Sequence, residues 1–281
     1  MSVALVALPM LLSSCAGASP QSASATPSRS EAAVGTDQPI PADLRDVVAR
    51  SAEIGCELYV LDQVAAIGTD VLLANVPHPD AKKVVGYLPL REGHESGPSG
   101  AFQVVFFTSE QPTRVAYRIH LLPKQQPRFE ALEPPEVAPD LLAGLVRARQ
   151  AAIAAVATPA QPLNPIVIPA EAYGESGTLV YLLAGTTKPH WAVLGKHYRA
   201  LVADGGSQVS YLKELTKSVI EMPTQVDGSP AEALVITHLV TDYPLETHVF
   251  TSLLVGLPIF VATSRGNWRV NGDKIAFLGA K

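Results

Sequence analysis

The first third of the chain changes from helical to alternating spacing of its apolar residues. Over residues 41 to 75 the apolar positions, among them Leu44, Val48 and Leu58, lie on one side of a helix. Residues 84 to 90, 101 to 108 and 114 to 122 are short apolar runs, and the last of them alternates. This part predicts a long helix followed by an antiparallel meander.

The middle third is divided by prolines. Five prolines cross residues 122 to 139, which predicts a connection, because proline removes a backbone donor. Residues 140 to 157 predict an alanine-rich helix, followed by a second proline-rich connection. Strands are predicted over residues 178 to 184, 191 to 194, 196 to 203 and 208 to 212, with Asp204, Gly205 and Gly206 turning the last pair. The apolar side of the helix contains Leu141, Leu142, Leu145, Val146 and Ile153.

The last fifty residues have the densest regular pattern. Residues 232 to 240 are apolar and β-branched without helical spacing, which predicts a buried strand. Asp242 is placed to cap a helix that Gly256 ends. Two more strands follow, and Asn271-Gly272 is typical of a tight hairpin. The chain therefore predicts an α+β fold with an antiparallel or mixed sheet, a long N-terminal helix, a middle helix and a C-terminal β-α-β-β unit.

Composition and charge exclude some functions. The chain has 281 residues, 47% of them hydrophobic, which is enough for a full core. Its net charge of −5 and the lack of Lys and Arg clusters argue against nucleic acid as a partner. Phosphate-binding, dinucleotide-binding, HExxH, CxxC and GxSxG motifs are absent from the sequence.

The N-terminus predicts export. Residues 3 to 12 are apolar but too few to span a bilayer, and Leu12-Ser13-Ser14-Cys15 resembles a bacterial lipobox. That resemblance implies a signal peptide over residues 1 to 15, lipidation of Cys15, and, with Ala16 next, an outer-membrane anchor facing the periplasm. An ordinary cleaved signal peptide or a chance apolar start are the alternatives. Residues 16 to 40, rich in Ala, Ser and Pro, predict a disordered tether to a single α+β domain over residues 41 to 281.

Cys56 is the only other cysteine, so a disulfide between two core residues is excluded. A lone cysteine of this kind is typically buried and inert. The alternative is a pairing site for another chain.

His238 and His248 are the residues with the clearest potential for chemistry. Two imidazoles and a third ligand bind zinc while leaving a fourth position for water. Asp242, Glu246 and His197 have side chains of the right type for the third ligand. The alternative is structural: His238 on a buried strand with its ring hydrogen-bonded, and His248 on the exposed or half-buried side of a helix.

The same region resembles the tail of the JAB/MPN metalloprotease-like superfamily. In that family an HxH strand precedes an acidic ligand at a helix start and a strand similar to GLPIFVAT, which is residues 256 to 263 here. This chain has Ile236 at the first His position and His248 where the family has Asp. The resemblance implies a divergent zinc-dependent hydrolase with His238 and His248 as ligands.

A second resemblance, to uncharacterised proteobacterial secreted proteins, covers most of the chain after residue 40. It rests on Tyr59, Asp62 and Asp70 in the opening helix, on the His197-Tyr198-Arg199 hairpin and on residues 237 to 275. It implies export and no particular activity. We therefore expect an exported, lipid-anchored envelope protein without enzymatic activity or cofactor. It would bind or scaffold an envelope component or ligand through a surface around Tyr243, His248 and Arg265.

Overall fold

The fold was obtained as a computed structural model that describes residues 36–79, 84–92, 100–157, 159, 162–203 and 205–280. These residues form three α-helices and sixteen strands, which confirms the predicted α+β class. Three four-stranded sheets carry most of the strands, and two further antiparallel pairs, β7 with β10 and β11 with β12, form small two-stranded ribbons. Those short strands are Trp191–Val193, Glu221–Pro223, Gln225–Val226 and Ser229–Pro230.

The first sheet is the predicted meander with one additional strand. β1 (Gly86–Glu92), β2 (Ala101–Phe107) and β3 (Arg114–Leu121) pair in order, and β4 (Arg128–Val137) follows as an edge strand. The prediction of a connection here was wrong. Pro134 and Pro135 of β4 lie where the pairing register of β3 with β4 shifts. This shift falls between the pair Tyr117 with Ala131 and the pair Val115 with Glu136. Prolines are tolerated at a bulge on an edge strand because neither position needs a ladder donor.

The second sheet has the order β5-β6-β8-β9 and is covered on both faces. Its strands are Leu163–Pro169, Thr178–Ala184, Tyr198–Val202 and Val209–Glu214. Along β6, Leu179, Tyr181 and Leu183 pack on one side in a cluster with α1, and Val180 and Leu182 pack on the other with α2. β5 is the second strand that the prolines concealed. It also lies at an edge, where Pro165 and Pro169 are compatible with pairing.

Helix α2 (Asp140–Ala155) covers the second sheet with small residues. Ala148 and Ala152 are fully buried beside Val146, whereas Leu141 is 79% exposed and Ile153 is 38% exposed. The predicted apolar side of this helix was therefore partly wrong. Alanine methyl groups allow the helix to approach the sheet closely, so the larger side chains are not needed at the contact.

The third sheet is the C-terminal unit that the sequence predicts. β13 (Leu234–Thr237) and β14 (Ile259–Thr263) are parallel and joined by α3 (Glu246–Val255), and β15 (Gly266–Asn271) and β16 (Lys274–Gly279) complete it. β13 is an edge strand covered on one face, so it alternates, with Val235 64% exposed. The predicted cap at Asp242 was wrong, because α3 begins after Leu245, and Gly256 ends it in the left-handed region.

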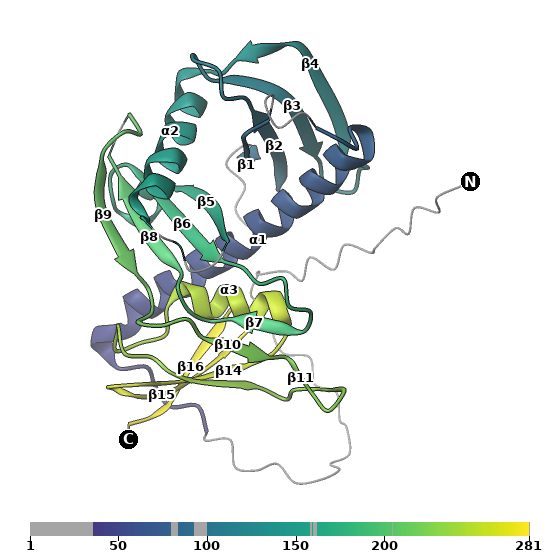
Figure 1. The fold of residues 1–281 in the computed structure, drawn as a ribbon. Coiled ribbons are helices and arrows are strands. Elements are labelled where there is room, and N and C mark those ends of the chain that lie inside the picture. The colour runs from purple at the N-terminus through teal and green to yellow at the C-terminus, as the bar shows by residue number, and fades with distance from the viewer. Residues whose placement is uncertain are drawn as a thin grey trace.

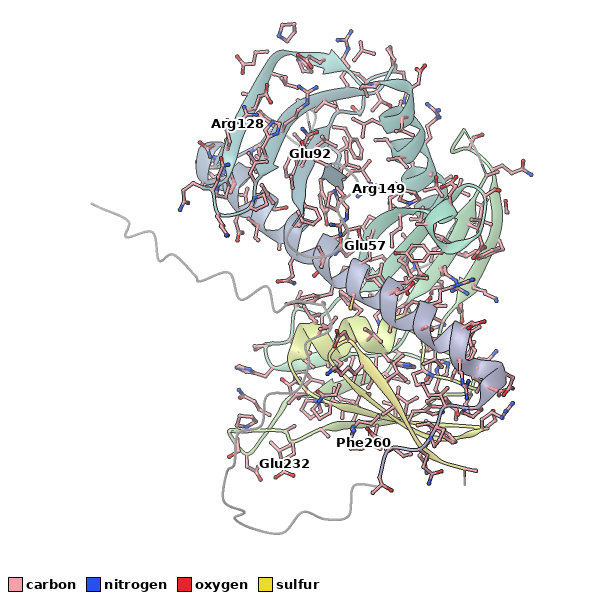
Figure 2. The ribbon with its side chains drawn as sticks, turned by 180° about the vertical axis from the view of Figure 1, so that it is seen from behind. Glu57, Glu92, Arg128, Arg149, Glu232 and Phe260 are labelled. Carbon is pink, nitrogen blue, oxygen red and sulfur yellow. The ribbon has the colours of Figure 1, made fainter. Side chains whose placement is uncertain are left out.

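Helix α1 (Arg45–Asn75) connects the three sheets, as the two opposite views in Figures 1 and 2 show. Its N-terminal part packs in the cluster of the third sheet, and its C-terminal part packs against the first two. Before it, Gln38 bridges to Phe277 of β16 and Asp37 pairs with Arg269. Asp37 and Gln38, which precede residue 41, thus already contact the third sheet. No helix in the described ranges is long and apolar enough to cross a membrane.

Candidate functional site

The fold brings His238 and His248 together. His238 follows β13 and its backbone N–H donates to Ala262 of β14, while His248 lies in the first turn of α3. The ring centroids are 4.9 Å apart and the rings are nearly perpendicular, at 87°. The predicted proximity of the two imidazoles is therefore present, at the point where the crossover connection begins.

Hydrogen bonds determine which nitrogen of each ring carries the proton. The Leu245 N–H donates to Nδ1 of His248 over 3.0 Å, so a neutral His248 carries its proton on Nε2. The Thr241 hydroxyl donates to the Tyr243 carbonyl, so it accepts from Nε2 of His238 over 2.9 Å. Both rings are thus Nε2–H tautomers. His248 Nε2 is buried without a hydrogen-bond partner among the described residues.

Both side chains are buried, which agrees with the structural alternative for His238 but not for His248. His238 is 3% exposed with its ring hydrogen-bonded, as that alternative expected. His248 is 1% exposed, so its expected place on the exposed or half-buried side of the helix was wrong. Burial lowers the pKa of His238 to about 4. Burial, and then the neighbouring His238 and His197, lower the pKa of His248 well below its ordinary value.

The three candidate third ligands have other partners. Glu246 accepts from Tyr181 over 2.8 Å and from Arg199 over 3.0 Å. His197 accepts from the Ala184 N–H over 2.9 Å, and burial lowers its pKa to about 4. Asp242 accepts from the Ser264 hydroxyl. In the described ranges no group of three or more His, Cys, Asp or Glu residues is arranged to hold a metal ion.

Tyr243 and Arg265 are the other two predicted binding residues, and their contacts differ from those of the two histidines. Tyr243 is half-buried against two hydrophobic clusters. Arg265 makes a two-pronged ion pair with Asp43, with distances of 2.9 and 3.0 Å, on the surface. Tyr243 and Arg265 stay predicted contact residues. His248 is buried, so it cannot be part of the predicted binding surface.

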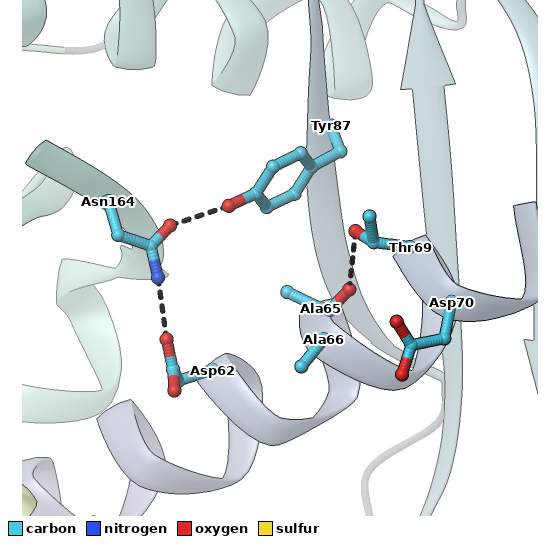
Figure 3. Close-up of a pocket in the computed structure, with 7 residues that line it drawn as sticks. All are labelled: Asp62, Ala65, Ala66, Thr69, Asp70, Tyr87 and Asn164. Atoms are coloured by element: carbon cyan, nitrogen blue, oxygen red, sulfur yellow. Dashed lines mark hydrogen bonds between the residues drawn. The ribbon is translucent and has the colours of Figure 1, made fainter. Parts of the chain in front are cut away.

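A polar pocket that the sequence analysis did not predict lies where α1, β1 and β5 meet (Figure 3). The Tyr87 hydroxyl donates to Asn164 Oδ1 over 2.6 Å, and Asn164 Nδ2 donates to Asp62 Oδ1 over 2.5 Å. The cavity has a volume of about 220 Å³. Ala65, Ala66, Thr69 and Asp70 complete its lining along α1.

The pocket contains a carboxylate that has no cationic partner among the described residues. Burial raises the pKa of Asp62, an effect that the bonds from Asn164 and Gln63 only partly offset. Burial also raises the pKa of Tyr87. The Arg149 guanidinium acts to lower the pKa of Tyr87, and its carbon lies 5.9 Å from the centroid of the Tyr87 ring. Arg149 does not line the cavity. No ion pair within the described ranges includes Asp62 or Asp70.

The sequence contains only a partial indication of this pocket. Asp62 and Gln63 stand between the buried Leu61 and Val64 on α1, and Asp62 is only partly exposed, which is less usual for a carboxylate. Tyr87 and Asn164 are 77 residues apart in the chain. No local sequence pattern connects these two residues. They meet only because two different sheets pack on α1.

Comparison with protein-family models, with curated proteins and with solved structures finds no match to this chain. The resemblances to the JAB/MPN superfamily and to secreted proteobacterial proteins therefore stay predictions.

Proposed function

We propose that this protein is an exported, lipid-anchored envelope protein that binds a small polar ligand in the pocket of Asp62, Tyr87 and Asn164 without chemically transforming it. The observation that carries the binding role is the pocket itself. Its polar side chains come from three elements and are held in place by a continuous chain of hydrogen bonds. Preorganised polar groups in a concave site are what orient small ligands.

The anchor rests on the sequence. Cys15 lies outside the described residues, at the end of the lipobox-like Leu12-Ser13-Ser14-Cys15. Several acyl chains on one residue give stable membrane attachment, because each buried methylene contributes about 0.8 kcal/mol. The proposed partners are thus the membrane, through the lipid, and a small ligand or another envelope component, with nucleic acid excluded by charge.

The anchor is tested by metabolic labelling with palmitate in a Gram-negative host. The parent chain should incorporate label and fractionate with outer membranes, and Cys15→Ser should lose both properties. Cys56→Ser is the matched control, since it removes the other cysteine and should keep the label. Equal labelling of the Cys15→Ser chain would contradict the anchor.

The binding role is tested on the full-length Cys15→Ser chain with a fragment set of amines, polyols, sugars and carboxylates, followed by NMR. Ala66 lines the pocket and is exposed on α1, so Ala66→Phe should fill the cavity without disturbing the core. Ala49→Phe, at an exposed position of the same helix, is the control. We expect at least one fragment to bind the parent and Ala49→Phe and to lose at least tenfold in affinity for Ala66→Phe. If no fragment behaves so, the proposed function is wrong.

The zinc-dependent hydrolase is the second candidate, supported by the 4.9 Å separation of the His238 and His248 rings. Zinc needs a nitrogen lone pair from each ring, but the bond from Leu245 leaves the His248 proton on Nε2. Binding would therefore require that bond to break. One zinc per chain by mass spectrometry, lost in both His238→Ala and His248→Ala, is the result that this candidate requires.

A further inference from the structure

The pocket of Asp62, Tyr87 and Asn164 offers acceptors and almost no donors. The Tyr87 hydroxyl hydrogen is used by Asn164, and the Thr69 hydroxyl hydrogen is used by the Ala65 carbonyl over 2.8 Å. Both oxygens keep lone pairs, as do the two carboxylates, Asp62 and Asp70. One N–H of Asn164 is the only remaining side-chain donor among the described lining residues. A ligand must therefore supply hydrogen-bond donors.

The charge of the lining indicates the same ligand. Among the described residues of the lining, Asp62 and Asp70 are the only charged ones, and neither has an ion-pair partner within the described ranges. An ammonium group beside Asp62 would supply the counter-charge that this partly buried carboxylate lacks, with three N–H donors for the surrounding acceptors. An anionic ligand would meet two uncompensated carboxylates.

The geometry points to a small aliphatic amine as the ligand, with one ammonium group at Asp62 and Tyr87 and a second ammonium group, in the preferred ligands, at Asp70. This inference rests on the proposed function, because it names the ligand class of the same pocket. Asp62 and Asp70 are eight residues apart on α1, which separates their Cα atoms by about 12 Å along the helix axis. Ala65 and Ala66 lie between them, and Figure 3 shows the Asp70 carboxylate turned toward Ala66. An apolar chain with a charged group at each end matches that order of carboxylate, methyl groups and carboxylate.

The size of the cavity favours small ligands. About 220 Å³ corresponds to roughly seven water molecules in the liquid and lies below the 300 to 1,000 Å³ typical of sites for drug-sized molecules. A divalent metal ion is a poor match as well. Calcium and magnesium need about six oxygen ligands within reach of one point, and the two carboxylates are separated along the helix.

Isothermal titration of the full-length Cys15→Ser chain tests the inference with calcium and with three organic probes of equal chain length: cadaverine, pentylamine and pentanediol. We expect cadaverine to bind at least tenfold more tightly than pentylamine, and pentanediol and calcium not to bind. Asp62→Asn should weaken both amines at least tenfold. Asp70→Asn should weaken only cadaverine, to the affinity of pentylamine. Glu53→Gln, on an exposed position of α1, is the matched charge control and should leave both affinities within twofold.

The outcomes separate this inference from the proposed function. One outcome is that the amines fail to bind, while a neutral or anionic fragment binds the parent and loses affinity for the Ala66→Phe variant. The proposed ligand class is then wrong and the binding role stands. If no probe or fragment depends on the pocket, both are wrong. Equal binding of pentanediol and pentylamine, or amine binding unchanged in Asp62→Asn, would overturn the assignment of the ammonium to Asp62.

Discussion

His248 shows how one residue of ambiguous type acquires a structural role. As the third residue of α3 it accepts the Leu245 N–H through Nδ1, a position in which Glu or Gln usually performs this function. The sequence predicted His248 on a helix capped at Asp242, whereas the helix begins only after Leu245. The zinc interpretation placed His248 near His238, and the two rings do lie 4.9 Å apart. The complete burial of His248 could not be predicted, because α1, which packs on α3, and the segment around His197 come from distant parts of the chain.

We predict that His248→Gln keeps the fold and makes it more resistant to acid. Glutamine restores the usual cap and does not titrate. A buried histidine with a lowered pKa binds its proton mainly in the unfolded state, so the folded state loses stability as the pH falls below 6.5. The loss reaches about 1.4 kcal/mol per pH unit for each such histidine. For His238 and His197 it continues to about pH 4.

Urea unfolding at pH 7, 5.5 and 4.5 measures this effect. At pH 7 the free energy of unfolding of His248→Gln should differ from that of the parent by about 1 kcal/mol or less, the range of a cap exchange. Between pH 7 and pH 4.5 the free energy of unfolding should fall less for His248→Gln than for the parent. His78→Gln, at an exposed position, is the control and should follow the parent. Parallel curves for parent and His248→Gln would show that His248 is not held neutral by burial.

At the scale of elements, the contact of α1 with α3 depends on the absence of one side chain. A Cβ on Gly55 would lie 2.5 Å from Val249 Cβ and 2.6 Å from the Glu246 carbonyl oxygen of α3. Gly55 is thus a place where the two helices approach closely. On α2, by contrast, a Cβ on Gly144 would meet only the end of Arg147, at 3.7 Å.

These two glycines make a matched pair of substitutions. Gly55→Ala should destabilise the protein by about 1 to 3 kcal/mol, because overpacking against backbone and Val249 outweighs the gain in helix propensity. Gly144→Ala should stabilise it by up to about 1 kcal/mol, since only the propensity changes. Thermal unfolding of both variants beside the parent measures the difference. A Gly55→Ala variant as stable as Gly144→Ala would mean that the helices separate without cost.

At the scale of the molecule, Glu246 joins the second sheet to the third. It is 2% exposed at the start of α3 and accepts from Tyr181 of β6 and Arg199 of β8. Burial alone would lower the pKa of Arg199, but Glu246 and Tyr181 outweigh it and raise that pKa above the ordinary value. Arg199 therefore stays charged beside Glu246, and the contact links the second sheet to α3.

A double-mutant cycle tests the role of this pair. Glu246→Leu should cost about 3 to 5 kcal/mol, because Arg199 is left without its counter-charge. Adding Arg199→Met should recover a large part of that loss, since the buried charge is then removed as well. Chemical denaturation of the parent, both single variants and the double variant measures the coupling. Additive losses would show that the two side chains do not depend on each other.

Local patterns in the sequence determined most elements of this protein. Helical spacing predicted α1, alternation predicted the meander, and the glycine and hairpin residues predicted the C-terminal unit, because these depend on residues a few positions apart. They failed at β4 and β5, since proline is compatible with a strand when that strand lies at an edge, and edges are defined by distant neighbours. The pocket has the same origin. Asp62, Tyr87 and Asn164 meet because two sheets pack on one helix, and no spacing along the chain encodes that meeting.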